Sequence, residues 1–80
     1  MKVLLNDINT LKGVVNICNK YVDDVYAIKD GYVVNAKSLL DLFLLSIDLS
    51  QEVELIIDTY RDSVITNFCR DIKNIDTIQM

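Results

Sequence analysis

The chain of 80 residues has no histidine, no proline and no tryptophan, and it contains two glycines and two cysteines. Without histidine, neither a Ser-His nor a Cys-His pair can form, which removes the usual arrangements for nucleophilic catalysis. Two cysteines alone are too few for the common zinc sites. Two separate glycines do not make a phosphate-binding loop. The sequence therefore predicts a protein that is not an enzyme and holds no metal and no cofactor.

An excess of basic residues is also missing. Eight lysines and arginines face twelve aspartates and glutamates, which gives a formal net charge of −4. Because the phosphate backbone dominates affinity for nucleic acids, an acidic chain without a basic cluster is a poor candidate for binding them or anionic membranes. Most carboxylates stand singly, and the pair Asp23-Asp24 precedes a predicted strand. This spacing is typical of solvated surface charge rather than of an acid–base pair.

No apolar run approaches the ~20 residues that a membrane-spanning helix needs. The start "MKVLLND" is too short for the apolar region of a signal peptide, so we expect a cytoplasmic protein. Cys18 and Cys69 are not in a CxxC pattern, and we expect two reduced thiols buried in the core. A disulfide is the alternative, and it is uncommon in the cytosol. The length predicts one domain, residues 1–80.

The first part of the chain predicts a strand over residues 1–5 and then a helix. Asn6 and Asp7 are suitable caps. Apolar residues with helical spacing predict one buried helix face. Gly13 interrupts this pattern, either as a neutral surface position or as a site where a partner approaches closely. The apolar positions are Ile8, Leu11, Val14 or Val15, Cys18 and Tyr21.

Two runs rich in strand-forming residues follow, 22–29 and 32–35. They flank Asp30-Gly31, a pair typical of a two-residue type I′ hairpin turn. A helix beginning after Ser38 is predicted next.

The last part predicts a strand and a third helix. "QEVELIID" alternates apolar and polar residues, so one face of this strand is expected to be covered. Thr59 with Asp62 three positions later resembles a capping box. The end of the chain after Ile75 is expected to fray. The predicted buried side of the helix consists of Val64, Ile65, Phe68, Cys69 and Ile72.

The order of elements is therefore βαββαβα. It predicts an α+β domain with a four-stranded antiparallel sheet and three helices on one face.

The stretch "NAKSLLDLFLLSIDL" contains more apolar residues than one helix face can bury. Between Leu39 and Leu45, six large apolar residues accompany a single aspartate, and they point all around a helix. A small domain cannot bury all of them. The surplus indicates a surface for a partner protein or for a second copy of the chain, or side chains that are merely exposed.

Asn35-Ala36-Lys37-Ser38 and the leucine-rich helix after it resemble the HPr family, the phosphocarrier proteins of the bacterial sugar phosphotransferase system. The likeness continues without a gap through "LLDLFLLSIDLSQEVELII", and the βαββαβα order is the same. The resemblance implies an HPr-like open-faced β-sandwich and a cytoplasmic bacterial protein connected with sugar transport.

The resemblance fails at the family's active site. In the family, a histidine before the first helix carries the phosphoryl group and is followed by alanine, arginine and proline. The corresponding segment here, residues 6–10, is shortened and has no histidine, arginine or proline. Asp7 lies near that position, where it is either an acyl-phosphate site or, more simply, a helix cap.

The family's second site is a serine that a dedicated kinase phosphorylates in many Gram-positive bacteria, after which the protein binds a transcription regulator. Ser38 matches this serine, although Ser38 followed by Asp41 also fits a helix cap, and the two readings are compatible. The resemblance also implies a docking face on this helix, with Leu42 and Ile47 turned to the core. The expected docking residues are Leu39, Leu40, Phe43 and Leu45.

The leading hypothesis is a non-catalytic, HPr-like regulatory or docking protein. Its expected partners are phosphotransferase components, a serine kinase or a transcription regulator, and a homodimer is an alternative. Two other classes remain, a structural or oligomer-forming module and a small-molecule-sensing module, both unrelated to sugar transport. No convergent set of polar residues in the sequence indicates a pocket for the sensing module.

Overall fold

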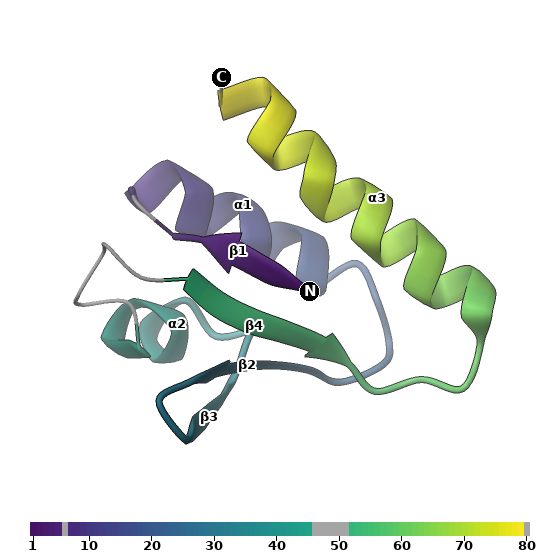
Figure 1. Cartoon of the computed structure of the whole chain (residues 1–80), viewed down its shortest axis with the longest axis horizontal. Coiled ribbons are helices and arrows are strands. Elements are labelled where there is room, and N and C mark those ends of the chain that lie inside the picture. Colours follow the sequence, from purple (N-terminus) through teal and green to yellow (C-terminus); the bar gives the residue numbers. More distant parts are fainter. Residues whose placement is uncertain (6, 46–51, 80) are drawn as a thin grey trace.

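The computed structural model describes residues 1–5, 7–45 and 52–79, in the predicted order of elements (Figure 1). The four strands form one antiparallel sheet in the order β1-β4-β2-β3. The predicted α+β architecture is therefore confirmed. The elements are β1 (Lys2–Leu4), α1 (Ile8–Cys18), β2 (Val25–Lys29), β3 (Tyr32–Asn35), α2 (Leu39–Leu45), β4 (Glu52–Ile57) and α3 (Asp62–Gln79).

The sheet has one covered and one open face because apolar residues alternate along its strands. Val53 and Leu55 of β4 are buried, whereas their neighbour Ile56 is exposed. Side chains of Val3, Val25 and Ala27 join the same buried cluster, together with residues from all three helices. In Figure 1, β1 passes in front of α1, so the sheet and the helices form two layers.

The β2–β3 hairpin follows the predicted turn chemistry. Lys29 pairs with Tyr32, which leaves Asp30 and Gly31 as the only turn residues. Their φ angles are 51° and 84°, as a type I′ turn requires. Glycine adopts positive φ without strain, and aspartate tolerates it better than most residues.

Helix α1 begins where the sequence predicts. Asp7 is its N-cap with an extended backbone, and its side chain accepts a hydrogen bond from the N–H of Thr10 at 2.8 Å. Ile8, expected on the buried face, is exposed at the first helical position. Gly13 lies where α3 crosses, since a Cβ atom there would meet Ile75 Cδ1 at 3.3 Å. Gly13 is therefore a site of close approach within the chain, where α3 packs, whereas the approach of a partner is not tested.

The start of α3 differs from the prediction. The helix begins at Asp62, and the carbonyl of Arg61 accepts the N–H groups of Val64 and Ile65. The Thr59 hydroxyl instead accepts a hydrogen bond from the Arg61 N–H at 3.2 Å, two residues along the chain. The predicted capping box is therefore wrong in register. The helix extends to Gln79, four residues past Ile75, and the expected fraying of this end stays a prediction.

The buried side of α3 is narrower than predicted. Phe68 and Ile72 are fully buried, whereas Ile65 is exposed and Cys69 is half-exposed. Ile65 and Cys69 are four residues apart, so they share the margin of the stripe. Cys18 is fully buried, and both thiols are free, as expected. Within residues 1–5, 7–45 and 52–79, no helix combines the length and the apolar character needed to cross a membrane.

Replacing Gly31 by alanine should lower the free energy of unfolding by about 1 kcal/mol, because a Cβ atom is disfavoured at a φ of 84°. Asp30→Asn is the matched control, since asparagine suits the first turn position equally well. Urea denaturation of both variants measures the difference. Equal stability of the Gly31→Ala protein and the parent would contradict the type I′ assignment.

Candidate functional site

The segment before α2 is fixed by short-range hydrogen bonds. The Asn35 side-chain oxygen accepts the N–H of Lys37 at 2.9 Å, and the Ser38 N–H donates to the Asn35 carbonyl at 3.1 Å. Both bonds turn the chain sharply at the end of β3. The sequence "NAKS" therefore leads directly from the sheet edge into the helix.

Ser38 caps α2. Its Oγ accepts a hydrogen bond from the Asp41 N–H at 3.2 Å, and its carbonyl accepts the N–H of Leu42 at 3.0 Å. Asp41 lies in the first turn, where its negative charge interacts favourably with the positive end of the helix dipole. The cap interpretation of Ser38 is thus confirmed. The side chain is half-buried, and its phosphorylation stays a prediction.

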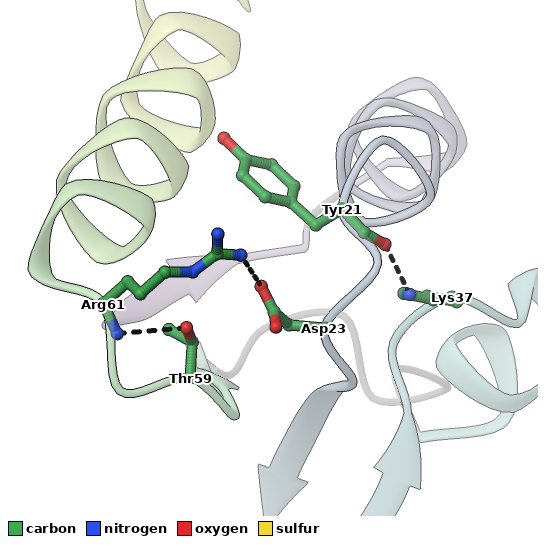
Figure 2. A network of polar contacts seen from close by, with 5 residues as sticks. All are labelled: Tyr21, Asp23, Lys37, Thr59 and Arg61. Carbon is green, nitrogen blue, oxygen red and sulfur yellow. Dashed lines mark hydrogen bonds and ion pairs between the residues drawn. The ribbon is translucent and has the colours of Figure 1, made fainter.

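Lys37 and Asn19 attach this segment to the C-terminal end of α1. The Asn19 side-chain amide donates to the Val15 carbonyl at 2.9 Å and to the Lys37 carbonyl at 3.1 Å. The Lys37 ammonium donates to the Tyr21 carbonyl at 2.6 Å (Figure 2). A cation is favourable at this end of a helix, where free carbonyls gather. The sequence pattern did not predict these contacts.

Helix α2 is anchored by one fully buried side chain. Leu42 has 0% exposure, and Leu45 is half-buried against the same core. At the other end of the helix, the Lys29 ammonium donates a long hydrogen bond of 3.5 Å to the Leu45 carbonyl. A helix of seven residues is held here by its two ends and one apolar anchor.

The outer side of α2 is an apolar surface. Leu40 is 66% exposed, Phe43 47% and Leu44 56%. The expectation that Leu40 and Phe43 are accessible while Leu42 is buried is confirmed. Leu39 is also exposed, and we call Leu39, Leu40, Phe43 and Leu44 the α2 face.

The membership of the α2 face differs from the expected docking residues at two positions. Leu45 lies only about 60° from Leu42 around the helix, which turns it toward the core, whereas Leu44 lies about 160° away. A helical wheel centred on Leu42 would have shown from the sequence that Leu45 turns toward the core and Leu44 away from it. Ile47, expected in the core, lies outside the described residues.

Asp7 is not part of this surface. It caps the N-terminal end of α1, whereas Lys37 and Ser38 adjoin the C-terminal end, about 16 Å away along an eleven-residue helix. The structure therefore does not bring the two family sites together. The Asp7 carboxylate is exposed and engaged as a cap.

Two ionisable groups near α1 have raised pKa values, which lowers their reactivity as nucleophiles. Burial raises the pKa of the Cys18 thiol to about 11, although nearby Lys37 opposes this rise. Desolvation and a hydrogen bond from Tyr21 Oη to Asp71 at 2.8 Å raise the pKa of Tyr21 to about 12. Groups with such pKa values stay protonated at neutral pH, and a thiol in this state is a weak nucleophile.

Two further features lie near the site. Asp23, predicted as solvated, is half-buried and pairs with the exposed Arg61 at 3.7 Å (Figure 2); water screens the arginine side of this ion pair, so it contributes little stability. A groove of about 440 Å³ separates α2 from the hairpin and includes Tyr32, Val34 and Leu44 in its lining.

In the part of the chain that the structure describes, no cluster of His, Cys, Asp or Glu side chains is arranged to hold a metal.

No protein-family model, no curated protein and no solved structure matches this chain. The resemblance to the HPr family therefore rests on the sequence pattern and the order of elements.

Substitutions on α2 should separate its exposed face from its anchor. Leu40→Ser and Phe43→Ser should each lower the free energy of unfolding by less than about 1 kcal/mol, because both side chains are already exposed, Leu40 by 66% and Phe43 by 47%. Leu42→Ala should lower it by about 2–4 kcal/mol through a cavity in the core. Urea denaturation of the three variants measures this contrast. If all three lose stability alike, the leucines are core residues and no separate face exists.

Proposed function

We propose that this chain is a non-catalytic, HPr-like docking protein that binds another protein through the α2 face. The observation that carries the proposal is the division within α2, where Leu42 is fully buried while Leu40, Phe43 and Leu44 stay exposed. Grouped apolar side chains on a small domain are typical of interaction surfaces.

The way α2 is held favours binding. A seven-residue helix is marginal by itself, so its stability comes from its attachments. Ser38 caps its start, Asn19 and Lys37 fix the preceding segment to α1, and Lys29 contacts its last carbonyl. A surface fixed in advance loses little conformational entropy when a partner binds.

Side-chain chemistry supports a role without phosphoryl transfer. The chain has no histidine to carry the group, and Asp7, the residue near the family's histidine position, is engaged as a helix cap. The raised pKa values of Cys18 and Tyr21 oppose their use as nucleophiles. By resemblance, the partners are phosphotransferase components or a transcription regulator of a bacterial cytoplasm.

Ser38 is the candidate point of regulation, through a serine kinase. Its hydroxyl lies directly before Leu39 and Leu40, so a phosphate would add negative charge at the margin of the α2 face. Asp41, whose N–H the hydroxyl now accepts, carries a charge of the same sign. Phosphorylation would therefore favour partners with positive charge beside their apolar surface and disfavour partners with negative charge there.

Incubation with phosphoenolpyruvate and the general kinase of the phosphotransferase system should leave the protein unmodified, because no histidine is present. Intact-mass spectrometry measures the outcome in two samples: one is kept mildly alkaline, which preserves phosphohistidine in the control, and one is measured promptly near neutral pH, because alkali hydrolyses an acyl phosphate. A histidine-containing HPr protein in the same reaction is the control. A phosphoryl adduct on Asp7 would overturn the non-catalytic part of the proposal.

Titration of the isotope-labelled chain with an HPr-binding transcription regulator should shift the amide signals of residues 39–45. Leu40→Ser and Phe43→Ser should weaken binding at least about tenfold, because each removes an apolar contact from the centre of the surface. Leu4→Ser is the matched control, since Leu4 is exposed on the open face of the sheet.

The same titration after treatment with the serine kinase and ATP tests whether phosphorylation of Ser38 changes the affinity for the regulator. Ser38→Ala, which cannot be modified there, is the control. Shifts confined to the open face of the sheet, or equal losses in the Leu4→Ser and Leu40→Ser proteins, would refute docking through α2.

A further inference from the structure

The two edges of the sheet are protected differently. Edge strand β1 has three residues and carries Lys2, a charged side chain that discourages pairing with another chain. In the view of Figure 1, α3 lies on the outer side of β1, whereas no labelled element lies on the outer side of β3. Strand β3, Tyr32–Asn35, has four residues and no charge. Natural sheets seldom leave such an edge unguarded.

The register of the hairpin shows which backbone groups of β3 point outward. Tyr32 faces Lys29 across the two-residue turn, and Val34 faces Ala27, so the N–H and C=O groups of Tyr32 and Val34 bond to β2. Those of the alternate residues, Val33 and Asn35, point away from the sheet. Among the turn, loop and cap hydrogen bonds of the described residues, none involves Val33, and the Asn35 carbonyl accepts the Ser38 N–H.

Side chains along the same edge are apolar and accessible on both faces. Tyr32 is 70% exposed on the helix side of the sheet, and Val33 is 59% exposed on the open side. Aromatic and β-branched residues are those that pair best across neighbouring strands. The edge thus offers both unpaired backbone groups and side chains suited to another strand.

We infer that β3 pairs antiparallel with β3 of a second copy of this chain, about a two-fold axis at Val33. In this register Val33 lies opposite the partner's Val33, and each Val33 N–H donates to the other's carbonyl. Tyr32 lies opposite the partner's Val34, which makes an aromatic pair with a β-branched residue. The result is a continuous sheet of eight strands.

Self-complementarity is what favours a second copy as the occupant. At the two-fold axis, the outward N–H and C=O groups of Val33 meet those of the partner's Val33, so an antiparallel copy of the same strand pairs both donors with acceptors there. The contact involves few residues on each side and falls below the standard interface size, so the dimer should be weak and concentration-dependent. The pairing uses only residues of β3, so the inference does not rest on the proposed docking function, although Tyr32 lines the same groove as Leu44 of the α2 face.

Sedimentation equilibrium of the full chain between about 10 µM and about 1 mM tests the dimer, a range that covers weak association. Val33→Pro removes the outward N–H, and proline is tolerated on an edge strand where that group faces solvent. We expect dimerisation to weaken at least about tenfold in this variant. Val33→Thr keeps both the N–H and a strand-forming side chain, so it should stay within about threefold of the parent.

A second variant and a direct contact measurement protect the test from a folding defect. Val33→Lys places two like charges opposite each other at the axis and should also weaken the dimer. In a mixture of labelled and unlabelled chains, an intermolecular nuclear Overhauser effect between the two copies of Val33 is expected. A chain that stays monomeric throughout, or a dimer that survives both the proline and the lysine variants, overturns the inference. A dimer that is lost only in Leu40→Ser and Phe43→Ser has its contact on α2, and this result also overturns the inference. If monomeric Val33→Pro still binds the transcription regulator, docking through the α2 face does not depend on the dimer.

Discussion

The attachment of the Lys37 segment to the C-terminal end of α1 decides where the leucines of α2 can point. Asn19 bridges a helix carbonyl and the carbonyl of Lys37, while the Lys37 ammonium reaches the carbonyl of Tyr21. These bonds satisfy groups that the end of a helix leaves open. They also fix the position at which α2 begins, so that Leu42 alone enters the core completely. The exposed α2 face is therefore a consequence of how α1 ends.

Local signals in the sequence predicted local structure well. Asp30-Gly31 predicted the hairpin turn, Asp7 the cap of α1, and the spacing of Leu40 and Leu42 their opposite environments. Each depends on residues within one or two turns of each other, where backbone sterics and helical geometry decide the outcome.

Predictions that needed distances between elements were less successful. Cys69 matches the helical period of the core but lies at the edge of the stripe, because α1 and the sheet cover only its centre. The contact between Lys37 and Tyr21 joins the segment before α2 to the segment after α1, and no sequence motif predicts it. The unguarded edge of β3 depends on the strand order β1-β4-β2-β3, which the order of elements along the chain does not determine.

Strand β4 lies between β1 and β2, although it is the last of these four strands of the described residues to be synthesised. Until residue 57 has left the ribosome, β1 has no partner in the sheet, and the β2–β3 hairpin has an open edge on both sides. The β1–β4 pairing joins Lys2 with Glu54, so closing the sheet carries a large loop entropy cost. Completion of the fold is therefore a late event, and the nascent chain passes through a stage in which three apolar strands lack their central partner. Exposed strand edges of this kind are the surfaces through which incomplete chains aggregate.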